Sequence, residues 1–165
     1  MDTYLLDTNL VSVLYDARRP NHGTVRQAIA ALPAEAAQLV SVVTVGELRF
    51  GLALARAAGQ ALTHIEACLA QSETHPLAEV TRHTADAFAT VKSSIALARV
   101  DIRRRIPRWV EGWMDRVSGQ LLQIDENDLW IAGQAFERNY VVVTCDKDFT
   151  QIIAPAVPGL RVLLV

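Results

Sequence analysis

The sequence predicts an α/β fold in three layers, with a parallel sheet between two layers of helices. Short continuous runs of Val, Ile and Leu alternate along the chain with longer segments whose apolar residues recur at helical spacing. Such runs are typical of the strands of a parallel sheet, because helices cover both of its faces. The length of 165 residues suits one domain with a proper core, so we expect residues 1–165 to form a single domain.

The composition, with 51% hydrophobic and 21% charged residues, indicates a compact chain and excludes a disordered or fibrous one. No apolar stretch reaches the roughly 18 residues that span a membrane, and Asp2 and Asp7 argue against a secretory signal. We therefore expect a cytoplasmic protein with no membrane partner.

Cys68 and Cys145 lack CxxC spacing and predict neither a disulfide framework nor a zinc finger. The formal charge of −2 gives no overall basic field, but acids gathered in one pocket would mask a basic surface, so nucleic acid is not excluded.

The N-terminal part of the chain contains three apolar runs that predict strands, each followed by helical spacing. The first helical pattern breaks at residues 18–21, the second closes at Pro33, and Gly59 ends the third. Thr44 precedes its helix with Glu47 three residues later, as in a capping box, and Thr81 caps a long alanine-rich helix. The expected elements are strands at 4–6, 39–43 and 75–80, and helices at 9–15, 24–32, 44–58, 61–71 and 81–99.

The segment from residue 100 to residue 120 has the least regular pattern. Trp109, Val110, Trp113 and Val117 suggest another amphipathic helix, which three consecutive arginines and a proline interrupt. Beyond it, a polar stretch at 125–128 leads into a helix with an apolar inner face. Continuous apolar runs then predict a central strand at 141–144 and a last strand at 159–165.

Four acidic residues stand at the expected ends of strands or starts of helices. Each also has a purely structural explanation: Asp7 as an N-cap, Glu47 as the third residue of a capping box, Asp128 as an N-cap or helix-dipole partner, and Asp146 as a turn residue. Taken together, at least three of their elements would deliver the acids to one edge of a parallel sheet, where ligands bind in α/β proteins.

A cluster of these acids predicts a metal site. Carboxylates that are packed together raise one another's pKa values unless cations neutralise them. Ligands that are all oxygen atoms select hard ions, Mg²⁺ or Mn²⁺, in preference to zinc. Such an ion suits phosphodiester hydrolysis, because it lowers the pKa of an attacking water and stabilises the charge of the transition state. Whether one or two ions bind stays open.

Four stretches of the chain carry a family resemblance that extends over nearly its whole length. Leu5–Asn9, Gly46–Gly51, Asn127–Ala132 and Val143–Phe149 resemble, in order, the motifs of PIN-domain proteins, closest to the VapC toxins of bacterial toxin–antitoxin pairs. The resemblance implies a twisted parallel sheet between helices and a metal-dependent endoribonuclease that cuts structured RNA, such as a tRNA or ribosomal RNA. It also implies Mg²⁺ or Mn²⁺ as the cofactor, a homodimer, and a VapB-type antitoxin whose tail crosses the active-site groove.

The resemblance assigns roles to individual residues. Asp7 matches the central metal ligand and Asp128 a direct or water-mediated ligand, while Glu47 and Asp146 complete the catalytic metal site or orient water. The residues expected to support these acids are Thr8, Asn9, Thr144 and Asp148, of which Asp148 is alternatively only a capping residue.

Basic and aromatic residues outside the motifs have several explanations. The arginines could contact RNA phosphates, bind the antitoxin or form a solvated face. Trp109 and Trp113 could stack on bases, although a packed helix face or a dimer interface is favoured, and Arg49 could contact RNA or antitoxin or pair with an acid of its own helix. The cluster comprises Arg99, Arg103, Arg104, Arg105 and Arg108.

Three other functions compete with the toxin. A PIN-type nuclease without an antitoxin would share the acids. A non-catalytic module that binds RNA or protein has no physical reason to keep repelling carboxylates together. A phosphoacceptor receiver domain also clusters acids at strand ends, but no lysine follows a late strand in the expected Lys-Pro setting.

Overall fold

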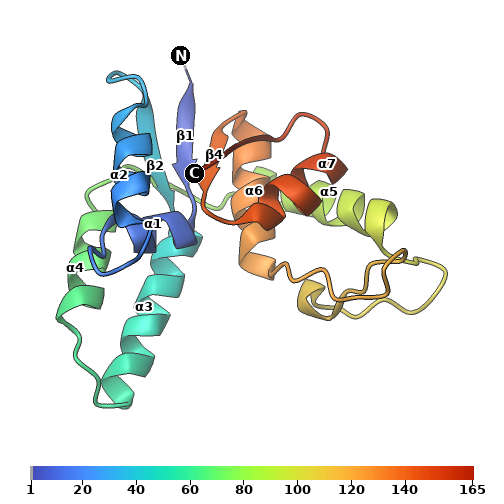
Figure 1. The fold of residues 1–165 in the computed structure, drawn as a ribbon. Coiled ribbons are helices and arrows are strands. Elements are labelled where there is room, and N and C mark those ends of the chain that lie inside the picture. Colours follow the sequence, from blue (N-terminus) through green and yellow to red (C-terminus); the bar gives the residue numbers. More distant parts are fainter. Residues whose placement is uncertain (1) are drawn as a thin grey trace.

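In a computed structural model that describes residues 2–165, the chain forms a five-stranded parallel sheet in the order β3-β2-β1-β4-β5. The prediction of a three-layer α/β fold is confirmed, because helices cover both faces of this sheet (Figure 1). The strands are β1 (Thr3–Leu6), β2 (Ala37–Ser41), β3 (Leu77–Ala78), β4 (Val141–Thr144) and β5 (Arg161–Leu164).

The helices fall into two groups, one on each side of the sheet. Figure 1 shows α1, α2, α3 and α4 on one side, and α5, α6 and α7 on the other. A single turn of 3-10 helix, η1 (Val110–Gly112), and a π-helical turn, η2 (Phe149–Ile153), complete the described elements. The α-helices are α1 (Thr8–Leu14), α2 (His22–Ala30), α3 (Val42–Ala57), α4 (Thr63–Ser72), α5 (Arg82–Arg99), α6 (Glu126–Arg138) and α7 (Ala154–Ala156).

Each side of the sheet has its own hydrophobic core. Leu5 and Val142 belong to the core beneath α5 and α6, whereas Leu6 and Val143 belong to the core beneath α1 to α4. All four side chains are fully buried. Because successive side chains of a strand point to opposite faces, a continuous apolar run supplies both cores at once. No helix within residues 2–165 combines the length and the apolar character needed to cross a membrane.

The register of the strands aligns the residues that follow them. Leu6 of β1 is level with Val40 of β2 and Val143 of β4, and the backbone N–H of Asp7 donates to the carbonyl of Val143 at 3.0 Å. The residues after β1 and β4 therefore lie at one carboxyl edge of the sheet, as predicted. Helix α6 begins at this edge and runs back alongside the sheet (Figure 1).

The predicted cap of α3 is wrong by three residues. The helix begins at Val42, and the hydroxyl of Ser41 accepts a hydrogen bond from the N–H of Val43 at 2.9 Å, so Ser41 is the N-cap and the strand predicted at 39–43 ends there. Ser41 is also fixed by donating to the buried side chain of Gln134 at 2.6 Å. Thr44 is consequently inside the helix, and Glu47 lies beyond its first turn and completes no capping box.

The cap of α5 is confirmed: Thr81 accepts from backbone N–H groups of the first turn, in a capping box with Thr84. The preceding strand is shorter than predicted, because β3 contains only Leu77 and Ala78. Pro76, in front of it, has no N–H to donate to a sheet.

The helix suggested around residues 109–117 is not present in the structure. Only η1 is helical there, and the chain then folds back on itself, with Met114 bridging Leu121 in antiparallel fashion and the N–H of Leu122 donating to the carbonyl of Trp113 at 2.9 Å. Gly119 supports this reversal with a φ of 70°, a conformation that glycine adopts at little cost.

Candidate active site

Asp7 lies immediately after β1 at the N-cap position of α1, yet its side chain makes no capping hydrogen bond. Its Oδ2 instead accepts from the hydroxyl of Thr144, at the end of β4, at 2.9 Å. Only 1% of the Asp7 surface is exposed. The carboxylate is thus held by the neighbouring strand, and capping does not account for its buried position.

Burial raises the pKa of Asp7 to about 6. The hydrogen bonds from Thr144 and the Thr8 backbone lower this pKa in part, whereas the charges of Asp146 and Glu47 raise it further. Three of the four predicted acids are therefore close enough to affect one another.

Asp128 is the third residue of α6, and the cap of that helix is Asp125. The two residues form a capping box in which Asp128 Oδ2 accepts from the N–H of Asp125 at 3.2 Å, and Asp125 Oδ1 accepts from the N–H of Asp128 at 2.9 Å. Burial is the main cause that raises the pKa of Asp128 to about 8, and the charges of Asp125, Asp7 and Asp146 add to it. Asp128 therefore belongs both to a helix cap and to the acidic cluster.

Glu47 is half-buried on α3, and both of its carboxylate oxygens accept hydrogen bonds. Asn127 donates to Oε1 at 2.9 Å, and the hydroxyl of Thr8 donates to Oε2. The Thr8 hydroxyl also lies 2.9 Å from that of Thr44. Sequence reasoning missed Asn127 and Thr44 as contributors; the position of Asn127 beside Asp128 in the same motif was the available signal.

Asp146 lies two residues after the end of β4, and hydrogen bonds to neighbouring residues hold it in place. Its N–H donates to the hydroxyl of Thr144 at 2.9 Å, and its Oδ1 accepts from the N–H of Asp148 at 2.8 Å. Thr144 thereby joins Asp7 to the Asp146 loop. Asp148 contacts Asp146 through its backbone, and burial, followed by the charge of Asp146, raises the pKa of the Asp148 carboxyl. Asn9 is exposed and lines a hollow of about 380 Å³ together with Asp146.

The donor chemistry of this cluster fits a hard divalent cation. All four acids offer only oxygen atoms, and none of them forms an ion pair with a basic side chain within residues 2–165. In the same part of the chain, however, no three acidic, histidine or cysteine side chains lie close enough to hold an ion as they stand. Asp128 and Asp146 each direct one oxygen to a local N–H, while the other oxygen has no hydrogen-bond partner in the described chain.

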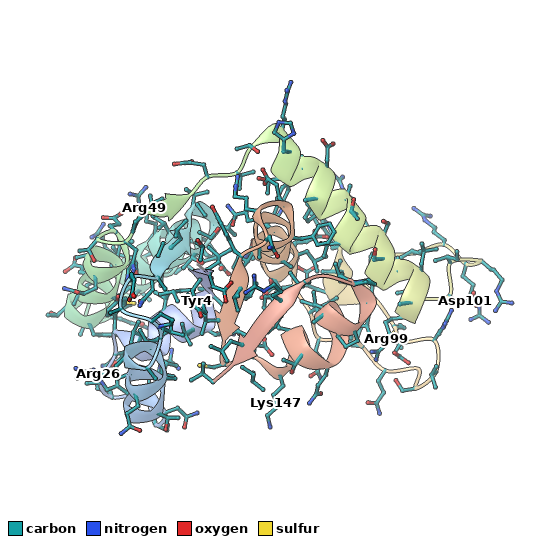
Figure 2. The ribbon with its side chains drawn as sticks, turned by 90° about the horizontal axis from the view of Figure 1, so that it is seen from above. Tyr4, Arg26, Arg49, Arg99, Asp101 and Lys147 are labelled. Atoms are coloured by element: carbon teal, nitrogen blue, oxygen red, sulfur yellow. The ribbon has the colours of Figure 1, made fainter. Side chains whose placement is uncertain are left out.

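The arginines considered at the sequence level lie in two separate regions. Figure 2 shows Arg49 at one end of the molecule and Arg99 with Asp101 at the other. Arg49 pairs at 2.7 Å with Glu73, at the end of α4, and so does not form the ion pair within its own helix that was one alternative. Arg103 and Arg104 pair with Asp101, while Arg105 is exposed.

Solved structures with a similar fold include VapBC complexes and a VapC toxin. VapBC2 from Rickettsia felis, bound to a DNA fragment from its promoter, has a TM-score of 0.64 at 15% identity over 98% of both chains. VapBC-5 from Mycobacterium tuberculosis has 0.60 at 22% identity over 100% of both chains. VapC20 of the same organism, described as a sarcin–ricin loop cleaving toxin, has 0.54 at 17% identity over 96% of this chain and 99% of its own.

The sequence itself carries the family assignment. None of the curated proteins compared matches the chain significantly. The sequence model of the PIN domain, in contrast, matches residues 4–154, which include β1, β4, α6 and all four acids of the site. The chain belongs to the PIN domain family.

Proposed function

We propose that this protein is a metal-dependent endoribonuclease and the toxin of a type II toxin–antitoxin pair. The observation that carries the proposal is the burial of Asp7 and Asp128 beside two further acids, with which no basic side chain of residues 2–165 forms an ion pair. Burying unpaired charges is costly, so the positive charge that such a site requires would come from a bound cation.

Asp7, Asp128 and Asp146, together with Glu47, would hold Mg²⁺ or Mn²⁺. Such an ion, when bound, supplies a water of lowered pKa and stabilises negative charge on a reacting phosphate. The protein's own polar residues position the acids: Thr144 holds Asp7 through its hydroxyl, and Thr8 and Asn127 fix both oxygens of Glu47. A carboxylate restrained on both oxygens is suited to orient a water molecule as well as to complete the metal site.

The family and the similar structures support the substrate and the partners that we propose. Structured RNA, a tRNA or ribosomal RNA, is the proposed substrate, and one structural relative is described as cleaving the sarcin–ricin loop. A VapB-type antitoxin is the proposed partner, since chains of similar fold come from structures of VapBC systems. We further propose that residues 1–165 act as one domain, since two cores share one sheet, and that the protein works as a homodimer in the cytoplasm, where its RNA substrate would be.

The decisive experiment is cleavage of total cellular RNA by the purified, antitoxin-free protein with Mg²⁺ or Mn²⁺, with EDTA as a control. Asp7→Asn should lower cleavage by about a thousandfold, since several kcal/mol of charge stabilisation correspond to three powers of ten in rate. Asp86→Asn, which removes an exposed acid of α5, should leave cleavage within about twofold of the unmodified protein.

The two variants also separate the competing functions. Metal-dependent fragments that disappear in Asp7→Asn, with its circular dichroism and melting temperature retained, would support the nuclease. Equal cleavage by Asp7→Asn would contradict the role of Asp7. No cleavage by the unmodified protein, together with no binding of Mn²⁺ by calorimetry, would indicate a non-catalytic binding module instead.

A further inference from the structure

The segment between α5 and α6 is a basic region within an acidic chain. Residues 99–120, named here the arginine segment, contain six arginines and three acidic residues, while the whole chain has a formal charge of −2. In Figure 1 this segment lies beyond the ends of α5 and α6, on the side opposite to α4. Its positive charge is therefore concentrated at one end of the molecule.

Buried side chains hold the arginine segment in a fixed conformation. Val110 and Trp113 are 0% and 4% exposed and belong to the core beneath α5 and α6. The indole N–H of Trp113 donates to the carbonyl of Pro107 at 2.9 Å, and Asp115 pairs with Arg99 at 2.6 Å. An anchored loop loses little conformational entropy when it binds a ligand, in contrast with a mobile one.

The anchor connects the arginine segment to the start of α6, two residues from Asp128. The carboxylate of Glu126 pairs with Lys92 and accepts from the N–H of Val110 at 3.4 Å. The N–H of Glu126 in turn donates to Glu111 at 3.1 Å, and Lys92 donates to the carbonyl of Arg108 at 3.2 Å. The arginine segment is therefore tied to the first turn of α6, the turn that carries Asp128.

The outer surface of the arginine segment has cations that the described chain does not neutralise. Within residues 2–165, Arg105 and Arg108 pair with no carboxylate. Arg103 and Arg104 share Asp101, but their side chains are 88% and 86% exposed. Ion pairs as exposed as these contribute little, so both guanidinium groups can exchange Asp101 for a phosphate.

An exposed aromatic ring accompanies these cations. Trp109 is 58% exposed, and the guanidinium of Arg108 lies over its ring at 4.9 Å. Arg104, Arg105 and Met114 also line a hollow of about 480 Å³. Exposed aromatic rings beside arginines bind unpaired bases by stacking, while the arginines bind phosphates.

We infer that the arginine segment is a binding surface for single-stranded RNA, which holds the unpaired part of the substrate beside the acidic site. The inference rests on the proposed nuclease function for its link to catalysis, but the binding itself does not depend on cleavage. The charge favours RNA over a second copy of the chain, because two copies that met through this segment would place like charges against each other. Phosphates, by contrast, complement four guanidinium groups within six residues.

The test measures binding of a fluorescein-labelled, single-stranded 20-nucleotide RNA of mixed sequence to the full-length protein in EDTA, over a series of salt concentrations. Arg105→Ala with Arg108→Ala should weaken binding about tenfold and reduce the slope of log K against log salt by about 1.4, which corresponds to two phosphate contacts. The matched control is Arg26→Ala with Arg82→Ala, which removes two other exposed arginines and should change neither. Arg26 lies at the opposite end of the molecule from Asp101 in Figure 2.

Trp109 provides a second, independent measurement. Trp109→Ala should weaken binding of the same RNA about tenfold, and Trp109→Phe should restore it to within about threefold, because any aromatic ring can stack on a base. A duplex of equal length should bind more weakly than the single strand and should not respond to Trp109→Ala.

Three outcomes would overturn the inference. The first is an unchanged salt slope in the Arg105/Arg108 double variant, and the second is an equal loss in the Arg26/Arg82 control. The third is a loss of self-association in sedimentation with RNA affinity unchanged, which would identify a protein interface. RNA binding that depends on the arginine segment, without any cleavage, would instead refute the nuclease and leave this inference standing.

Discussion

Asp7 and Asp115 both have little exposed surface, 1% and 6%, but Asp7 follows the central strand of the sheet while Asp115 lies in the surface segment between α5 and α6, and their pKa values move in opposite directions. Burial raises the pKa of Asp7 to about 6, and the acids around it add to the shift. Hydrogen bonds from the N–H of Ser118, the guanidinium of Arg99 and the N–H of Val117 lower the pKa of Asp115 to about 2. Loss of hydration dominates at Asp7, which lies deep in the protein, whereas hydrogen-bond donors dominate at Asp115, which lies just below the surface. The depth of a covered carboxylate and its partners together therefore decide its pKa.

The comparison extends to the two regions that contain these residues. In the described part of the chain, no basic side chain pairs with the carboxylates of the acidic site at the carboxyl edge of the sheet, whereas the arginine segment has more guanidinium groups than acids. Each region therefore carries unbalanced charge that its proposed ligand would neutralise. The ligand is a divalent cation in the acidic site and RNA phosphates on the arginine segment.

The largest expected effect is the difference between replacing an acid of the proposed metal site, Asp128, and replacing the acid of the arginine segment, Asp115. Asp128→Asn should lower metal-dependent RNA cleavage by about a thousandfold and abolish Mn²⁺ binding, because it removes a proposed ligand. Asp115→Asn should leave Mn²⁺ binding unchanged, but lower the free energy of unfolding by about 1 kcal/mol or more, since Arg99 loses its charged partner. Calorimetry with Mn²⁺, RNA cleavage and urea denaturation of both variants measure these effects.

The comparison would be broken by a crossed result. Either of two results would contradict the comparison: loss of metal binding in Asp115→Asn, or normal Mn²⁺ binding by Asp128→Asn. The acidic site would then not differ from the arginine segment in requiring a bound cation to balance its buried acids.

The placement of the acids was largely predictable from sequence. A continuous apolar run followed at once by Asp7, and another followed by Thr144 and Asp146, predicts residues at the carboxyl edge of a parallel sheet, and the register of β1 and β4 agrees. The direction of each side chain was not predictable. Whether Asp128 completes a capping box or points into the site depends on Asp125 and on how α6 packs against the rest of the protein. Packing between distant elements is not visible in the local sequence pattern.

Two local errors have a common cause. Ser41 and Thr44 are both suitable caps, and only the contact of Ser41 with Gln134, far away in sequence, selects the first. Trp109 and Trp113 have helical spacing, but the pairing of Trp113 with Leu122 creates a fold-back in which one ring is buried and the other exposed. Long-range contacts decide between local alternatives that periodicity cannot distinguish.

These two tryptophans give the second prediction. Trp113→Ala should lower the free energy of unfolding by about 3 kcal/mol, because a side chain that is 4% exposed leaves a cavity and the carbonyl of Pro107 loses its donor. Trp109→Ala should change it by less than about 0.5 kcal/mol, since its ring is 58% exposed. Urea denaturation of the two variants makes the comparison. Equal losses of stability in the two variants would mean that the buried ring of Trp113 does not anchor the arginine segment more strongly than the exposed ring of Trp109.

The smallest expected effect is the dependence of stability on pH in the metal-free protein. Asp128 has a pKa of about 8 in the folded state, against about 3.9 when unfolded. Between these values the folded state binds more protons, so this residue lowers the free energy of unfolding as the pH rises. Asp128→Asn lacks this effect, and its stability relative to the unmodified protein should increase steadily from pH 5 to pH 8.5.

Saturating Mn²⁺ should reverse the sign, because a cation binds the ionised carboxylate and its affinity grows as protons leave. The unmodified protein should then gain stability over the same pH range, and Asp128→Asn should not. Urea denaturation in EDTA and in Mn²⁺, at matched pH values, measures both trends. In EDTA, the difference in free energy of unfolding between the unmodified protein and Asp128→Asn could instead stay constant with pH. That result would show that other groups of the chain already stabilise the Asp128 carboxylate, as they stabilise Asp115. The contrast between the acidic site and the arginine segment would then have no electrostatic basis.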